Sequence, residues 1–92
     1  MKQVLLGLAL AAFSGATLAG ADCEKHPEEE WLSPLELQKK IVNEYGFAIK
    51  LFKVDGDCYE IYGWEQAEGG EEVKIEVYFD TKTGDIVKKE LD

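Results

Sequence analysis

The stretch SPLELQKKIVNEYGFAIKLFKV, residues 33–54, changes its hydrophobic period halfway and decides the fold. Ser33 and Glu36 form a capping box, and the proline that follows Ser33 suits the first turn of a helix. We predict that this helix continues to about Tyr45 and ends at Gly46, because glycine readily takes the left-handed conformation that closes a helix. Helical spacing predicts that the buried stripe consists of Leu37, Ile41, Val42 and Tyr45.

Beyond Gly46 the apolar side chains recur every second residue, which is the period of a half-buried strand. Turn signals follow at Asp55-Gly56, at the glycine pair 69–70 and from Thr81 to Gly84. They separate four predicted strands, at about 47–54, 58–65, 72–80 and 85–89. The predicted fold is α+β, with one α-helix packed on a four-stranded antiparallel β-meander. The face of the sheet under the helix is predicted to carry Phe47, Ile49, Tyr59, Ile61, Val77 and Phe79.

The overall charge of the chain is strongly negative. The 92 residues include 19 acidic and 10 basic side chains, which gives a formal net charge of −9, and every basic residue is a lysine. A chain this acidic, with no arginine to grip phosphates, is expected to bind no nucleic acid. Anionic lipid surfaces should also repel it. The hydrophobic fraction of 46% nevertheless indicates a folded domain, and the length allows one.

The N-terminal segment, residues 1–21, has the organisation of a secretory signal peptide. Lys2 gives a positive start, an apolar run follows, and Ala19-Gly20-Ala21 has the A-x-A pattern of a signal-peptidase site. We predict cleavage after Ala21, with cleavage after Ala19 as a close variant. A retained membrane anchor is the competing interpretation, but the flank that follows is acidic rather than cationic. Cleavage would leave no stable membrane anchor and would place the protein in the periplasm or outside the cell.

After this leader we expect an irregular lead at residues 22–32 and a domain at residues 33–92. Two cysteines remain, Cys23 and Cys58, and in an oxidising compartment they are predicted to form one disulfide. Closing this loop stabilises a chain by roughly 3.5–4 kcal/mol at most. The alternative, a metal site, lacks ligands, because neither cysteine lies in a C-x-x-C motif and the chain has one histidine. No metal and no other cofactor is expected.

Candidate catalytic groups are few, and we predict that the protein is not an enzyme. The one histidine, His26, lies beside a proline in the lead and is expected to be a solvated surface residue. Ser33 is used as the helix cap and both cysteines are oxidised, so no nucleophile and base are available as a pair. Glu60 and Glu76 should face each other across two strands, where we expect a solvated ladder of charges rather than a catalytic pair. Asp55-Gly56-Asp57 is interpreted as a turn and not as a calcium loop.

The aromatic side chains are the feature that folding alone explains least. Strand alternation places four of them on the sheet face away from the helix, namely Phe52, Tyr62, Trp64 and Tyr78. An open sheet face with several aromatic side chains resembles a surface that recognises a protein partner. A second interpretation stays open, in which the lead, through Trp31 and the Cys23–Cys58 link, folds over this face and buries it.

Three segments of the chain resemble the PepSY domain family. They are residues 44–47 at the end of the helix, the strand Cys58-Tyr59-Glu60-Ile61-Tyr62, and EVYFDTKTGDIV at 76–87. The last segment is similar to the family's closing pattern E-V-x-V-D-x-x-T-G-x-I-V, with Phe79 in place of the usual aliphatic residue. The resemblance spans about 55 residues, from Ser33 to Val87.

The resemblance implies a non-catalytic regulatory module of bacterial type. The family occurs in propeptides of thermolysin-type metallopeptidases, in spore germination proteins and as free secreted or membrane-attached domains. Its suggested role is to bind and restrain peptidases. We therefore predict an exported module that acts by protein–protein contact, with a secreted or envelope peptidase as the partner that it inhibits or modulates. The alternative is a periplasmic protein that binds a small ligand or a cation.

Overall fold

The computed structural model describes residues 20–92. The predicted signal peptide falls, except for its last two residues, on positions 1–19 and so lies outside the described part. The lead contains a 3₁₀ turn, η2 (Glu28–Glu30), and the helical segment comprises α3 (Pro34–Lys40) and a π-helical turn, η3 (Ile41–Tyr45). The strands are β1 (Ala48–Asp55), β2 (Cys58–Gln66), β3 (Glu72–Asp80) and β4 (Ile86–Leu91).

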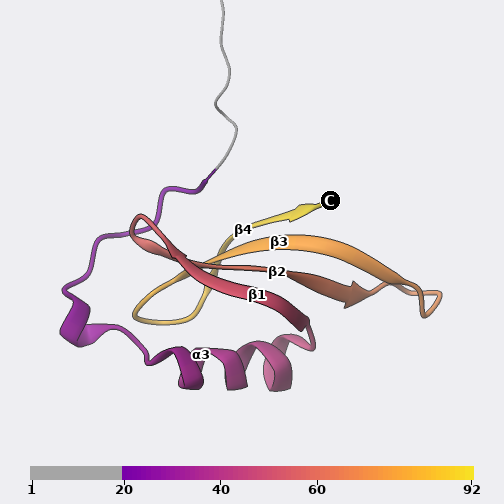
Figure 1. Ribbon diagram of the computed structural model, residues 1–92, viewed down its shortest axis with the longest axis horizontal. Coiled ribbons are helices and arrows are strands. Elements are labelled where there is room, and N and C mark those ends of the chain that lie inside the picture. The colour runs from indigo at the N-terminus through magenta and orange to yellow at the C-terminus, as the bar shows by residue number, and fades with distance from the viewer. Residues whose placement is uncertain (1–19) are drawn as a thin grey trace, which may run out of the picture.

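The four strands form one antiparallel sheet in the order β1-β2-β3-β4, and the helix lies against one of its faces (Figure 1). The predicted α+β fold, one helix on a four-stranded antiparallel meander, is confirmed. We name the two sides of the sheet the helix face and the far face. Within residues 20–92 no helix is long and apolar enough to cross a membrane.

The helix begins where the capping box predicts. The Ser33 hydroxyl accepts a hydrogen bond from the Glu36 backbone N–H at 3.1 Å, and the Glu36 carboxylate accepts one from the Ser33 N–H at 3.0 Å. The helical segment ends at Gly46, whose φ of 76° lies in the left-handed region. Both ends are therefore fixed by local sequence, as capping chemistry requires.

The last turn of the helical segment is wider than an α-turn, and one predicted core position changes with it. Leu37 and Ile41 are fully buried, but Val42 is 51% exposed, so the prediction that Val42 belongs to the buried stripe was wrong. The π-turn η3 carries Tyr45 rather than Val42 over the core. The Tyr45 hydroxyl donates to the Gly84 carbonyl at 2.9 Å, which ties this turn to the β3–β4 connection.

The core lies between the helical segment and the helix face of the sheet. Its buried members alternate along β2 and β3 as predicted, and the cluster consists of Leu37, Ile41, Phe47, Tyr59, Ile61, Ile75, Val77 and Phe79. The Tyr59 hydroxyl donates to the Leu32 carbonyl at 2.7 Å, and Trp31 packs edge-on against the Tyr59 ring. Trp31 therefore lies on the helix face and does not cover the far face.

Strand β1 contains a bulge, which corrects a second prediction. The register shifts between Ile49 and Leu51, so Lys50 is the extra residue in this strand. From this point the alternation is reversed, because an extra residue moves each following side chain to the other face. Phe52 consequently lies on the helix face, with its ring centroid 5.1 Å from that of Tyr59. The predicted placement of Phe52 on the far face was wrong.

The lead crosses from the far face of the sheet to the helix face (Figure 1). On the far face the Gly20 N–H donates to the Tyr78 hydroxyl at 3.1 Å. The chain then passes the end of the sheet, where the turn η2 lies, and the Leu32 N–H donates to the Thr81 carbonyl at 2.8 Å. One part of the far face is therefore covered by the chain itself.

Candidate binding face

The lead divides the far face into two parts. The covered half, under residues 20–26, carries the side chains of Cys58, Glu60, Tyr78 and Asp80. The open half, farther along the same strands, carries the side chains of Leu51, Tyr62, Trp64 and Lys74. The two halves therefore differ in what they can contact.

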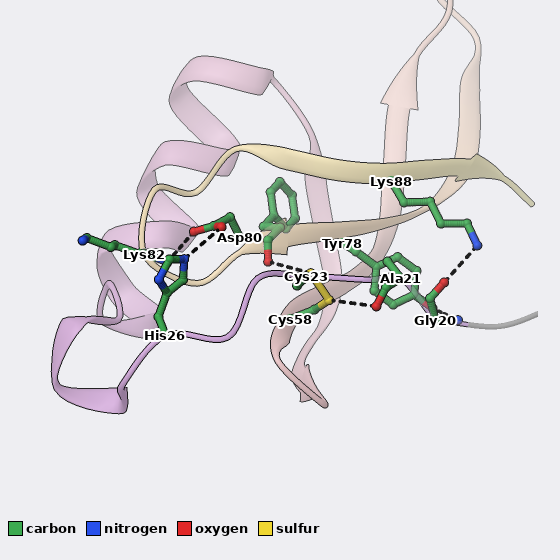
Figure 2. Close-up of a disulfide and its surroundings, with 10 residues drawn as sticks. Gly20, Ala21, Cys23, His26, Cys58, Tyr78, Asp80, Lys82 and Lys88 are labelled. Carbon is green, nitrogen blue, oxygen red and sulfur yellow. Dashed lines mark hydrogen bonds and ion pairs between the residues drawn. A yellow bond between two sulfur atoms is a disulfide. The ribbon is translucent and has the colours of Figure 1, made fainter.

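A disulfide between Cys23 and Cys58 fixes the lead to the covered half, as predicted (Figure 2). The two Cα atoms are 5.4 Å apart, and Cys58 is buried. The Cys23 sulfur lies 3.7 Å from the Phe79 carbonyl oxygen, and the Cys58 sulfur lies 3.5 Å from the Ala21 carbonyl oxygen. The link thus holds the lead directly against β2 and β3.

A second attachment joins the lead to the end of β3. His26 Nε2 lies 3.1 Å from Asp80 Oδ2, and the His26 side chain is only 12% exposed (Figure 2). The expectation that His26 is a solvated surface residue was wrong, because the link at Cys23 brings this part of the lead against β3. No local signal pairs positions 26 and 80, so sequence reasoning could have found this contact only by following the disulfide.

Asp80 also organises the turn that ends β3. Its Oδ1 accepts hydrogen bonds from the backbone N–H groups of Lys82 at 2.8 Å and Thr83 at 2.9 Å, and the Thr83 hydroxyl accepts one from Asp85 at 3.1 Å. Burial alone would raise the pKa of Asp80, but these backbone bonds and the His26 ring lower it below its ordinary value. The D-x-x-T-G segment is therefore a turn that presents a charged carboxylate to His26.

Two carboxyl groups meet at the edge of the covered half. Glu60 is 1% exposed, and the Tyr78 hydroxyl donates to Glu76 Oε2 at 2.7 Å. Burial and the neighbouring Glu76 carboxyl group raise the pKa of Glu60 to about 7, although Lys53 Nζ, 3.7 Å from Glu60 Oε1, opposes this. The neighbouring Glu60 carboxyl group and the hydrogen bond from Tyr78 lower the pKa of Glu76. The expectation of a solvated ladder of charges was wrong, because Glu60 is buried on the side of the sheet that the lead covers.

Glu60 is expected to make the stability of the fold depend on pH. Its folded-state pKa is raised, so its contribution is fully present below about pH 4.5 and is lost as pH rises through about 7. Glu60→Gln should therefore be more stable than wild type at pH 8, by roughly 1–3 kcal/mol, and nearly equal at pH 5. Urea unfolding at the two pH values measures this difference in unfolding free energy. Both proteins in the comparison keep the residues that precede Gly20. Glu68→Gln, in the exposed loop, is the control. If Glu60→Gln changed the unfolding free energy equally at both pH values, the raised pKa of Glu60 would be contradicted.

The open half holds a groove of about 390 Å³. Its lining combines aromatic, aliphatic and cationic side chains from three strands with one acidic residue near the C-terminus, and includes Lys50, Leu51, Lys53, Tyr62, Trp64, Lys74 and Asp92. Lys53 is drawn toward Glu60 and the Tyr62 ring. Lys50 and Lys74, by contrast, form no ion pair within the part of the chain that the structure describes. The groove therefore combines apolar and aromatic walls with three lysines and one aspartate, so its charged side chains are mainly positive.

The four aromatic side chains predicted to share the far face are separated. Tyr78, 2% exposed, lies under the lead, and Phe52 packs on the helix face. Tyr62 and Trp64 line the groove and stay half-buried. The covering interpretation thus applies to Tyr78 and not to the other two. Sequence analysis missed Leu51 as a lining residue, since nothing in the alternation of β1 reveals its bulge.

Within residues 20–92 the groups that nucleophilic catalysis would need are used in other ways. The Ser33 hydroxyl caps the helix, both cysteines are joined, and His26 is paired with Asp80. The groove itself presents aromatic, aliphatic and ammonium groups together with the carboxylate of Asp92. This combination of groups is typical of a binding surface.

Together these features define a small α+β module with one helix, a four-stranded meander and an N-terminal lead held by a disulfide. A family model described as peptidase propeptide and YPEB domain, PepSY_2, matches residues 3–90. Because this match covers nearly the whole chain, the protein belongs to the PepSY family. Domains of this family are generally non-catalytic propeptide or regulatory modules. Comparisons with curated proteins and with solved structures gave no match.

Proposed function

We propose that this PepSY domain is exported and regulates a peptidase by binding it through the open half of the far face. The observation that carries the proposal is the groove beside Tyr62 and Trp64, which lies outside the part covered by the lead. Membership of a family of peptidase propeptide domains supports a peptidase as the partner. The Cys23–Cys58 disulfide supports an oxidising location, periplasmic or extracellular.

The charge of the groove indicates which part of a partner it would take. The chain as a whole is strongly acidic, yet three lysines line the groove against one acidic residue, Asp92, and Lys50 and Lys74 have no ion-pair partner among residues 20–92. A partner segment with a carboxylate next to an aliphatic or aromatic side chain would pair with these lysines and fill the space beside Tyr62 and Trp64. Binding of such a segment would block or reshape the partner without any chemistry by this chain.

Trp64→Ala is expected to weaken the complex by roughly thirtyfold or more, because an aromatic anchor in a groove behaves as a hot spot. Calorimetric titration of the partner with the oxidised protein measures this change. Leu35→Ala is the matched control, since it removes a 61% exposed side chain from the helix and should leave the affinity unchanged. Equal affinities of wild type and a folded Trp64→Ala variant would exclude the open half as the binding surface.

A second candidate function, binding of a divalent cation, is favoured by one observation. A ring nitrogen of His26 and one carboxylate oxygen each from Glu24 and Asp80 all lie within 4.8 Å of one another. One imidazole with two carboxylates is a ligand set that suits Zn²⁺.

This second candidate predicts one Zn²⁺ bound per chain in a calorimetric titration. His26→Gln should abolish the binding, because it removes the nitrogen ligand. Glu29→Gln, in the exposed turn η2, is the control and should retain it. A titration that shows no heat beyond dilution would remove this candidate.

A further inference from the structure

Gly20, the first residue that the structure describes, is held on the far face by specific contacts (Figure 2). Its N–H donates to the Tyr78 hydroxyl at 3.1 Å, and that hydroxyl donates to Glu76 Oε2 at 2.7 Å. Its carbonyl oxygen accepts a hydrogen bond from Lys88 Nζ at 2.9 Å. The Gly20 nitrogen therefore lies one hydrogen-bonded group away from the Glu60–Glu76 carboxyl pair.

This carboxyl pair is incompletely satisfied. Glu60 is almost fully buried, and its Oε2 has no hydrogen-bond partner among residues 20–92. Lys53 Nζ lies 3.7 Å from the other oxygen, Oε1. A buried carboxyl oxygen without a partner is costly, so an additional donor or cation at this place would stabilise the fold.

The surroundings of Gly20 also carry more acidic than basic groups. Asp55, Tyr78 and Lys88 lie next to Gly20. The charged and titratable side chains that interact in turn with this group come from all four strands and are Lys53, Glu60, Tyr62, Glu76 and Glu90. Carboxyl groups outnumber ammonium groups in this set. A positive charge at the Gly20 nitrogen would reduce this excess of negative charge.

We infer that the exported protein is cut between Ala19 and Gly20, and that the new α-ammonium group of Gly20 is the counter-ion of the Glu60–Glu76 pair. The inference rests on the export proposed above. Thr17 and Ala19 provide the small residues that a signal peptidase needs before this bond. Hydrolysis adds one water across the bond, leaves a carboxylate on Ala19 and an amine on Gly20, and the amine takes up a proton.

Cleavage after Ala21, the site that the A-x-A pattern favours, would remove the two residues that make these contacts. The donor to Tyr78 and the acceptor for Lys88 would both be lost with Gly20. Cleavage after Ala19 keeps these contacts and strengthens one of them. A single amide N–H becomes an ammonium group with three donors, one of which can keep the Tyr78 contact, and its positive charge then lies one hydrogen-bonded group away from Glu76.

Removal of the leader would therefore change the stability of the folded domain, because it creates the Gly20 ammonium group. Opposite charges nearby raise the pKa of an amine above its ordinary value, which is about 7.7–8.0 for a chain terminus. The stabilisation by the Gly20 ammonium is therefore fully present at pH 7 and is lost as pH rises well above 8. The same ammonium favours the ionised form of Glu60, so the processed chain should lose the pH dependence expected for the extended chain.

The test has two parts. The precursor is exported from a bacterial host, and the intact mass of the mature chain separates a Gly20 start from an Asp22 start by one glycine and one alanine. Chains that begin at Gly20 with a free or an acetylated amine are then compared by urea unfolding. We expect a Gly20 start. We also expect a folding equilibrium constant roughly tenfold or more larger for the free amine at pH 7, and nearly equal constants at pH 10.

Glu76→Gln should remove most of this difference between the free and acetylated chains, whereas Glu68→Gln should leave it unchanged. An Asp22 start, or equal stability of the free and acetylated chains at pH 7, would overturn the inference and leave the proposed export and partner binding intact. An uncleaved precursor would overturn the inference together with the predicted leader. Partner binding is measured separately with Trp64→Ala, so its failure is distinct from each of these results.

Discussion

Removing the Cys23–Cys58 disulfide is expected to lower the free energy of unfolding by roughly 3–4 kcal/mol. The link joins positions separated by 35 residues and so restricts a large part of the unfolded chain. A domain of this size has a total stability of roughly 4–11 kcal/mol, which means that the loss takes a large share of it. Urea unfolding of the Cys23→Ser, Cys58→Ser double variant against the oxidised wild type measures the effect.

Reduced wild-type protein is the control for this experiment, because it lacks the link but keeps both sulfur atoms. It should unfold at the same urea concentration as the double variant. The lead would then be held on the far face by weaker contacts, such as His26 with Asp80 and Gly20 with Tyr78. A difference of less than about 1 kcal/mol between oxidised and reduced protein would contradict the role given to the disulfide.

Gly63→Ala is expected to cost about 3 kcal/mol or more. A Cβ atom at Gly63 would overlap the Ala48 carbonyl oxygen and lie 3.0 Å from the Ala48 carbonyl carbon. These are backbone atoms of the neighbouring strand, so no side-chain rotation relieves the overlap. Strand β1 must move away from β2 next to its bulge. Thermal or urea unfolding of the variant measures the cost.

Gly69→Ala is the matched control for this substitution. A Cβ atom at Gly69 would meet nothing within 4 Å, and its backbone is not among the glycines with positive φ. Its stability should therefore stay within about 0.5 kcal/mol of wild type. A loss below about 1 kcal/mol for Gly63→Ala would show that β1 shifts freely, against the close strand contact described here.

Most of the fold could be predicted because its signals are local. The capping box at Ser33 and the glycine at Gly46 mark the two ends of the helical segment, and both chemistries act within a few residues. Regular alternation marks β3 with its observed bounds, Glu72–Asp80. These features need no knowledge of distant contacts.

What the sequence could not predict depends on residues far apart in the chain. The extra residue Lys50 sits where β1 approaches Gly63 of the next strand, so alternation within β1 does not show it. The burial of Glu60 and the pairing of His26 with Asp80 both depend on the lead lying over the far face. The Cys23–Cys58 disulfide holds the lead in this place. For the candidate site, alternation therefore identified Tyr62, Trp64 and Lys74 on the far face, but not Leu51.

The most direct test of the proposed regulatory function is a titration of enzyme activity. A thermolysin-type metallopeptidase secreted by the source organism is assayed with increasing amounts of the oxidised protein, and in parallel with its Trp64→Ala and Leu35→Ala variants. We predict a saturable change in peptidase activity that Trp64→Ala shifts to roughly thirtyfold higher concentration and that Leu35→Ala leaves in place. Unchanged activity over the whole range, or identical curves for the two variants, would contradict binding through the open half.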